Sequence, residues 1–141
     1  MATLQKLAFL RTVPLFRYAS DEILLELSDN LMEQYATAGE EIVRKGQFGT
    51  EMYIITKGRV KVHDGDKIIA ELKDHDVFGE LAALAPEVRI ASITALENTF
   101  MLKIDHEELY EIMSKSMGFV KGIIEVLCQR ARAIANKNHY S

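Results

Sequence analysis

FGELAALAPEVRIASI, residues 78–93, is the stretch of the sequence that carries the most information about fold and function. Gly79 precedes a short run of helix-forming residues, 80–85, which Pro86 ends. The first N–H groups of such a helix have no partner within it, and with the positive end of the helix dipole they favour an anion. Arg89 can add a planar guanidinium that binds phosphate oxygens through two hydrogen bonds. The stretch therefore predicts a phosphate site.

Glu80 stands in the first turn of the same expected helix, beside the predicted phosphate site. Its carboxylate can accept hydrogen bonds from sugar hydroxyls, so a phosphate joined to a ribose suits Glu80 and Arg89 together. The residues alone leave two other interpretations open. Glu80 can serve only to complement the helix dipole, and the whole stretch can be a surface turn with a solvated Glu80 and Arg89.

The same stretch resembles the phosphate-binding cassette of cyclic nucleotide-binding domains. In that pattern Phe-Gly-Glu, an apolar residue, Ala and two apolar positions precede a short loop, an arginine and a strand of small residues. The matching positions are Phe78, Gly79, Glu80, Leu81, Ala82, Ala83, Leu84, Arg89, Ala91, Ser92 and Ile93. Upstream, the stretch KGQFGTEMYIITKGRVKV at 45–62 resembles the segment that leads into the β-barrel in this family. The matching residues are Gly46, Gly49, Tyr53 and Gly58. The resemblance covers roughly residues 10–135.

The resemblance implies a role for several of these residues. Arg89 is expected to bind the phosphate, and Glu80 to accept a hydrogen bond from the ribose 2′-hydroxyl. The backbone N–H groups of Gly79, Leu81 and Ala82 are expected to donate to the phosphate or the ribose. The ligand implied is a cyclic nucleotide, with no further cofactor.

The residues after the arginine bear on how closely the ligand fits and on its base. Ala91 and Ser92 are small enough for the strand to approach the phosphate, and the Ser92 hydroxyl is either an additional donor or an ordinary strand side chain. Family members that prefer cyclic GMP usually carry Thr or Ser directly after the arginine, and those that prefer cyclic AMP often carry Ala. Ile90 has neither donor nor acceptor, so we expect cyclic AMP, with cyclic GMP as the less favoured ligand.

The composition favours a single domain with a real core, since the chain has 141 residues of which 48% are hydrophobic. The lack of a signal peptide and the single cysteine lead us to expect a cytoplasmic protein. A net charge of −4 disfavours a protein that binds nucleic acid or a membrane surface. The apolar runs are too short to cross a bilayer, and the N-terminus has no signal-peptide cleavage site. The single cysteine, Cys128, lies in an apolar helical stretch and is expected to be a small buried side chain.

The residues that carry chemistry do not form a catalytic or metal-binding pattern. The histidines are scattered and none stands in a metal-binding pair; they are His63, His75, His106 and His139. No nucleophile elbow or Ser–His–Asp arrangement is present. We therefore expect a non-catalytic protein without a metal.

Short, evenly spaced strands between helical segments predict a β-sandwich or jelly-roll barrel flanked by N-terminal and C-terminal helices. The resemblance implies an α+β fold whose barrel is a β-jelly roll, with the short phosphate-binding helix in the barrel. The expected domain is the whole chain, 1–141, with a helical N-terminus at 1–32, the barrel at 33–104 and C-terminal helices at 105–137. Strands are expected at 33–37, 41–45, 51–57, 59–63, 67–72, 90–96 and 99–104.

The helical segments carry their own start and stop signals. A helix is expected over 3–12, and Ser20 is expected to cap the next one. Asp105 is placed to begin the C-terminal helices, with Glu108 three residues later. Gly118 is expected to mark a bend before the last helix, at 119–137.

The resemblance implies a cyclic nucleotide sensor whose last helix closes over the ligand. The basic residues near the end of that helix are either a solvated face that suits a helix C-terminus or a source of lid residues over the base, with Arg130 or Arg132 as the candidates. The sensor would act on an effector domain or through a second copy of the chain. The rival interpretation is a jelly roll that binds no ligand and serves protein–protein contact or dimerisation. A DNA-binding regulator would need a helix-turn-helix after the last helix, where only residues 136–141 remain.

Overall fold

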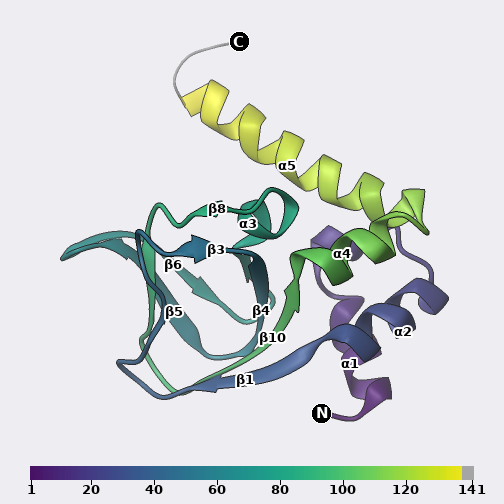
Figure 1. The fold of residues 1–141 in the computed structure, drawn as a ribbon, viewed down its shortest axis with the longest axis horizontal. Helices are drawn as coiled ribbons and strands as arrows, with labels where there is room; N and C mark the ends of the chain where they lie inside the picture. The colour runs from purple at the N-terminus through teal and green to yellow at the C-terminus, as the bar shows by residue number, and fades with distance from the viewer. Residues whose placement is uncertain (138–141) are drawn as a thin grey trace. The chain divides into compact units, whose positions relative to one another are not determined.

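Residues 1–137, which the computed structural model describes, divide into a helical unit and a β unit (Figure 1). The helical unit combines residues 1–29 with the segment from residue 111 onward, and the β unit comprises residues 30–110. The prediction of an α+β fold with a jelly-roll barrel is confirmed. That residues 1–141 act as one domain stays a prediction.

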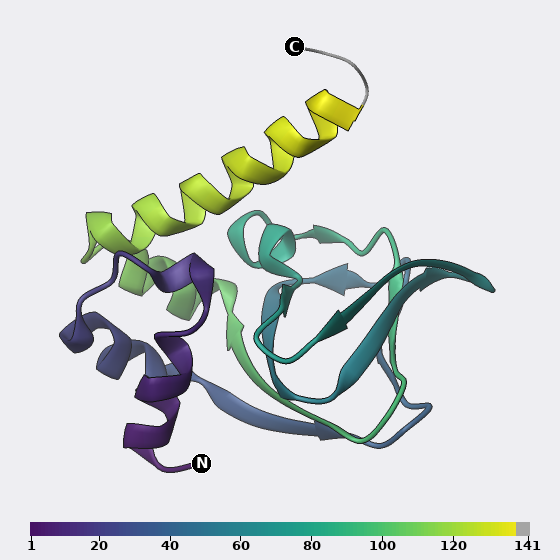
Figure 2. The same ribbon diagram turned by 180° about the vertical axis from the view of Figure 1, so that it is seen from behind.

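The β unit is a roll of antiparallel strands, visible from both sides in Figures 1 and 2. One sheet has the order β1–β10–β4–β7, with β1 at Met32–Ala36, β10 at Thr99–Asp105, β4 at Glu51–Lys57 and β7 at Val77–Phe78. The second has the order β2–β9–β5–β6, with β2 at Glu41–Val43, β9 at Ser92–Ala95, β5 at Arg59–Asp64 and β6 at Lys67–Lys73. A two-stranded ribbon joins β3, Phe48–Gly49, to β8, Glu87–Val88.

Both four-stranded sheets contribute to one apolar cluster inside the roll. Its buried members are Ala36, Val43, Tyr53, Ile55, Val60, Phe78, Ile93, Ala95 and Met101. In β10, buried Met101 lies between exposed Phe100 and buried Leu102, so the strand is covered on both faces along part of its length. This core fixes the strands that surround the candidate site.

The predicted strand at 90–96 is wrong at its start, because β9 begins only at Ser92. Arg89 still bonds to the segment before β3, residues 90 and 91 bend, and none of the three forms a regular strand before β9. The three two-residue strands β3, β7 and β8 were not expected. Alternation needs at least about four residues to be visible in a sequence, so such short strands leave no pattern.

The short helix α3, Glu80–Leu84, forms where the sequence predicts it and packs against β4. Gly79 precedes it with φ at 78°, in the left-handed region that glycine adopts without strain. Pro86 follows the last turn and cannot continue the helix, because it has no N–H group. The chain then turns into β8.

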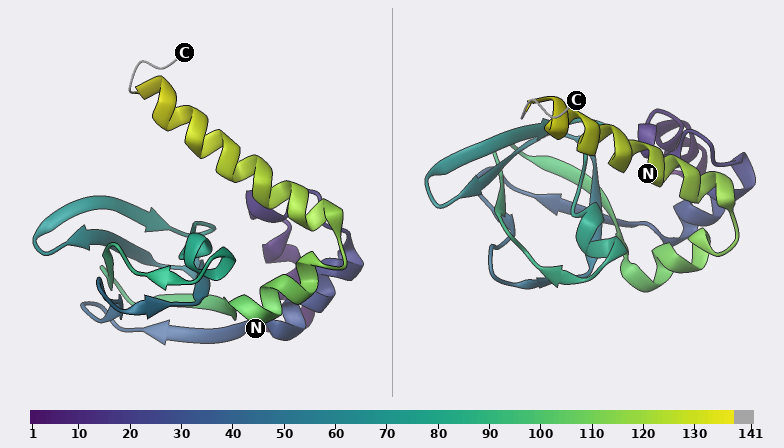
Figure 3. Two further views of the ribbon diagram at one scale, coloured as in Figure 1. Left: turned by 45° about the horizontal axis from the view of Figure 1, so that its top comes forward. Right: turned by 90° about the horizontal axis from the view of Figure 1, so that it is seen from above.

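The helical unit begins with α1 at Thr3–Leu10, η1 at Pro14–Phe16 and α2 at Asp21–Asn30. The Ile23 N–H donates to Ser20 Oγ at 3.2 Å, which confirms Ser20 as the expected cap of α2. α4, His106–Met113, begins directly after Asp105 as expected, and α5, Met117–Lys137, is one continuous helix (Figure 3).

Two predictions for α5 are wrong. Gly118 does not bend the chain, because it already lies in the first turn of α5, and the break falls at residues 114–116. Cys128 is exposed and not buried. It lies four residues after Ile124, which is 52% exposed, so both belong to the face of the helix opposite Phe119 and Ile123.

The first turns of α5 pack closely on the segment around η1. A Cβ on Gly118 would lie 2.5 Å from the Tyr18 carbonyl oxygen, and a Cβ on Gly122 would lie 2.5 Å from that of Leu15. The Phe119 ring stacks on Phe16 with centroids 5.5 Å apart. The two glycines therefore set how near the helix backbone approaches its neighbour.

Candidate functional site

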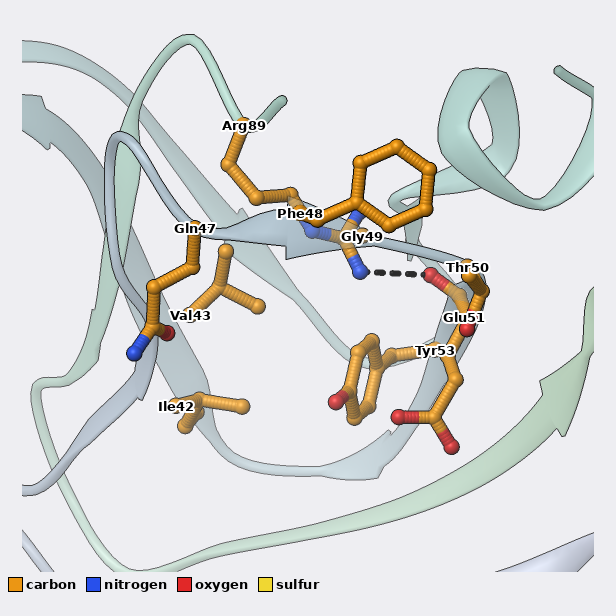
Figure 4. Close-up of a pocket in the computed structure, with 9 residues that line it drawn as sticks. All are labelled: Ile42, Val43, Gln47, Phe48, Gly49, Thr50, Glu51, Tyr53 and Arg89. Carbon is orange, nitrogen blue, oxygen red and sulfur yellow. Dashed lines mark hydrogen bonds between the residues drawn. The ribbon is translucent and has the colours of Figure 1, made fainter. Parts of the chain in front are cut away.

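A cavity of about 240 Å³ opens in the β unit beside Arg89 (Figure 4). Its wall is made by β2, by the segment that contains β3, by the start of β4 and by the loop after β8. The residues that line it are Ile42, Val43, Gln47, Phe48, Gly49, Thr50, Glu51, Tyr53 and Arg89. Of the eight residues expected at the ligand, Arg89 is the one that lines this cavity.

The β3–β8 ribbon directs the Arg89 side chain into the cavity. Past Val88 the ribbon continues through two backbone hydrogen bonds, from Arg89 N–H to the Gln47 carbonyl at 2.8 Å and from Gly46 N–H to the Arg89 carbonyl at 2.9 Å. Side chains alternate along an extended segment, so Val88 and Ile90 point the other way, at 54% and 79% exposed. Arg89 is thereby left as the inward residue of the three.

Two glycines make room for the Arg89 guanidinium. A Cβ on Gly49 would lie 2.1 Å from Arg89 Nε, and a Cβ on Gly79 would lie 2.9 Å from Arg89 Nη1. Arg89 Nη2 donates to the Glu51 carbonyl at 2.9 Å (Figure 4). The guanidinium is therefore held between Gly49 of β3 and Gly79, the residue that precedes α3.

Arg89 forms no ion pair with any residue in 1–137. Its one hydrogen bond from the side chain goes to a neutral carbonyl, and the side chain is half-buried. A half-buried cation without a carboxylate partner keeps its charge available to an anion.

Three of the expected residues, Glu80, Leu81 and Ala82, lie on α3, directly after Gly79. Glu80 and Ala82 are buried, at 8% and 3% exposed, and Leu81 points outward at 53%. Glu80 is thus the first residue of α3 but does not line the cavity. Its contact with a ribose stays a prediction.

The expected residues after the arginine have three different surroundings. Ile90 is exposed, Ala91 is half-buried and Ser92 is buried at the start of β9. Ser92 Oγ accepts a hydrogen bond from the Lys45 N–H at 2.9 Å, which joins β9 to the end of β2. The hydroxyl hydrogen of Ser92 is left for another acceptor.

Tyr53 forms part of the cavity wall and was expected only from the upstream motif. Its ring stacks on Phe78 with centroids 4.8 Å apart and planes 11° apart. Burial raises the pKa of the Tyr53 hydroxyl, the nearby Glu51 charge raises it further, and the Arg89 charge lowers it. The hydroxyl therefore stays protonated near neutral pH and can act as a donor.

The other wall residues could not be selected from the sequence as ligand contacts. Ile42 and Val43 come from β2, Gln47 and Thr50 flank β3, and their convergence depends on pairings between distant strands. The upstream motif included Gly49 as well as Tyr53, and the structure explains the missing side chain of Gly49 by the Arg89 guanidinium, 40 positions later.

The candidate lid residues lie in the helical unit. Arg130 and Arg132 are on α5 and both are exposed. Their action on a ligand stays a prediction. His139 lies outside the described residues.

Among residues 1–137, no group of three or more His, Cys, Asp or Glu side chains is arranged to hold a metal ion. No helix in that range combines the length and apolar composition needed to cross a bilayer.

Comparison with known proteins identifies the family. Residues 33–116 match the cyclic nucleotide-binding domain family. The chain is similar to human cGMP-dependent protein kinase 2, with 37% identity over 106 residues that make up 70% of this chain and 14% of the kinase. It therefore spans about a seventh of that relative.

Solved structures share the fold. The N-terminal domain of a transcriptional regulator from Streptomyces coelicolor A3(2) aligns with a TM-score of 0.77 and 26% identity, over 92% of this chain and 93% of that one. The catabolite activator protein of Thermus thermophilus aligns with a TM-score of 0.79 over 89% of this chain and 62% of that one, and at 23% identity it shows the fold alone. The chain belongs to the cyclic nucleotide-binding domain family, and it is a cyclic nucleotide-binding regulatory module.

Proposed function

We propose that this chain is a non-catalytic sensor that binds a cyclic nucleotide with the phosphate on Arg89. The observation that carries the proposal is the half-buried Arg89 guanidinium, which is held between two glycines at the cavity and pairs with no carboxylate among residues 1–137. A phosphate would supply a negative charge beside the guanidinium and accept two hydrogen bonds from its coplanar N–H groups. Isothermal titration of the whole chain with cyclic AMP and cyclic GMP tests the proposal, and absence of heat with both would refute it.

The start of α3 supplies the second half of the proposed site. A Cβ on Gly79 would lie 2.9 Å from Arg89 Nη1, so the N–H groups of the first turn, including those of Leu81 and Ala82, would donate to the same phosphate. Glu80 would face the ribose from this turn. Ala91 and Ser92 would lie behind the phosphate without a large side chain.

The signal is proposed to leave through α5, which carries Arg130 and Arg132 and follows the β unit in the chain. A ligand shifts a conformational equilibrium only by its difference in affinity for the two states. Amide exchange along α5 with and without ligand measures whether this helix responds. We propose that an effector domain or a second copy of this chain receives the signal.

Glu80 should make binding depend on the ribose 2′-hydroxyl. A hydrogen bond to a charged group contributes about 1.5–3 kcal/mol, so the wild type should prefer cyclic AMP to its 2′-deoxy analogue by roughly ten- to a hundredfold. Glu80→Gln keeps an acceptor but removes the charge, and should reduce that preference to about tenfold or less. Titration with both nucleotides measures it.

Glu87→Gln is the matched control, because it removes the same charge from β8, opposite Gly49. It should leave the 2′-hydroxyl preference unchanged. A wild type that binds both nucleotides equally would remove Glu80 from the site.

Ile90 should favour cyclic AMP over cyclic GMP, because an aliphatic side chain offers guanine no hydrogen bond. Cyclic GMP is the appropriate ligand for comparison, because the kinase relatives are named as dependent on it. Ile90→Thr places a hydroxyl at an exposed position directly after Arg89 and should narrow the difference in Kd by about two- to tenfold. Competition titrations with the two nucleotides measure the difference.

Val88→Thr makes the same kind of change on the same face of the ribbon, two residues earlier, and should leave the ratio of the two Kd values unchanged. Tighter binding of cyclic GMP by the wild type would contradict the assignment of the base preference to Ile90.

A further inference from the structure

The C-terminal end of α3 lacks the groups that normally complete a helix. The helix has five residues, and its last carbonyls have no continuing turn to accept from, since the chain leaves the helix at Ala85 and the next residue is Pro86. At the two ends of the helix, the Ala83 N–H donates to the Gly79 carbonyl and the Ala85 N–H donates to the Leu81 carbonyl. A helix this short is not stable alone, so its position depends on outside contacts.

Two side chains of α4 supply donors to this end of α3. His106 Nδ1 lies 2.5 Å from the Ala83 carbonyl oxygen, and the Tyr110 hydroxyl donates to the Leu84 carbonyl oxygen at 2.5 Å. A carbonyl only accepts, so Nδ1 carries the proton. The two residues are four apart on one helix face, and their rings lie 4.5 Å apart.

The start of α4 and Asp105 before it also bond to Thr50, a residue that lines the cavity. His106 N–H donates to the Thr50 carbonyl at 2.9 Å, and Thr50 Oγ1 donates to Asp105 Oδ1 at 2.7 Å. Thr50 directly precedes Glu51, whose carbonyl accepts from Arg89. Residues 105–110 therefore bind both the segment that holds Arg89 and the helix that begins beside it.

We propose that His106 and Tyr110 are positioning residues of the cyclic nucleotide site. They hold α3 by its C-terminal carbonyls and so fix its first turn at the distance from Arg89 that a phosphate and ribose need. They act through α3 and not by contact with the ligand, and the proposal rests on the proposed function of the chain.

Tyr110→Phe removes one hydroxyl and keeps the ring on His106. It should weaken cyclic AMP binding about two- to tenfold, the range of one neutral hydrogen bond, through faster dissociation. His106→Ala should do the same, while His106→Asn, which keeps a donor near the place of Nδ1, should bind within about twofold of the wild type. Exchange at the Ala83 and Ala85 amides should rise in Tyr110→Phe and His106→Ala without any ligand.

Tyr35→Phe is the matched control, because Tyr35 and Tyr110 are both 45% exposed and Tyr35 also contacts a ring, that of Phe100 on β10. It should leave affinity and exchange in α3 unchanged. If the wild type binds cyclic AMP and Tyr110→Phe and His106→Ala bind it equally well, the positioning role is overturned while the proposed function stands. If the wild type binds neither cyclic nucleotide, the proposed function fails, and faster exchange in the variants then shows only a structural clamp. If the affinity for cyclic AMP falls in step with the melting temperature in every variant, His106→Asn included, the losses reflect stability alone. That result would also overturn the positioning role.

Discussion

Arg89→Ala is expected to weaken binding of cyclic AMP by tenfold to several hundredfold while the chain stays folded. Each hydrogen bond between the guanidinium and a phosphate contributes about 1.5–3 kcal/mol, and a tenfold change in Kd corresponds to about 1.4 kcal/mol. The folded state should change little, because the side chain makes one hydrogen bond, to the Glu51 carbonyl, and no ion pair within the described residues 1–137. Titration calorimetry and thermal unfolding of the same samples measure the two effects.

Arg59→Ala is the control for net charge, since Arg59 is a half-exposed arginine on β5 that pairs with Glu71 and Glu97 at the surface. It should leave the affinity within about twofold of the wild type. Gly49→Ala is the complementary variant, because it keeps the arginine but places a Cβ where the guanidinium now lies. Like Arg89→Ala, Gly49→Ala should weaken the binding of cyclic AMP. Unchanged affinity in Arg89→Ala would end the assignment of the phosphate to this residue.

Gly122→Ala is expected to lower the free energy of unfolding of the helical unit by about 1–3 kcal/mol, the usual cost of overpacking. Helix propensity alone predicts the opposite sign, since alanine is about 1 kcal/mol better than glycine inside a helix. The close approach decides the sign, because the new Cβ would lie 2.5 Å from the Leu15 carbonyl oxygen, a backbone atom that cannot rotate away. Denaturant titration followed by circular dichroism measures the change.

Cys128→Ala serves as its control on the same helix. Cys128 is exposed, so this change also improves propensity but meets no neighbour, and its effect should stay within about 0.5 kcal/mol. A Gly122→Ala protein that is more stable than the wild type would show that α5 can move away from η1 without cost.

The sequence was informative where the chemistry is local. Gly79, the helix after it and Arg89 lie within eleven positions, so their types and spacing predict a phosphate site directly. Ser20 could likewise be assigned as a cap, because its partner is the amide of Ile23, three residues later. The stretches at 78–93 and 45–62 also carry a family resemblance that the match over residues 33–116 confirms.

The sequence did not predict contacts between residues that are far apart along the chain. His106 meets the Ala83 carbonyl 23 positions earlier, and no side-chain pattern marks which backbone carbonyl lacks a donor. Ile42 and Val43 reach the cavity wall only through strand pairing in the roll. The prediction for Cys128 failed for a different reason, since apolar neighbours in sequence do not show on which face of a helix a residue lies.

The exposed thiol of Cys128 is a site at which the chain can be labelled with a probe. It is the single cysteine of the sequence, and it lies on α5, the helix proposed to carry the signal. A maleimide fluorophore would therefore attach at one known place without removal of other thiols. Its emission would follow α5 in real time as nucleotide is added. The same thiol makes a reducing agent necessary in storage, because two exposed cysteines from different molecules can join as a disulfide.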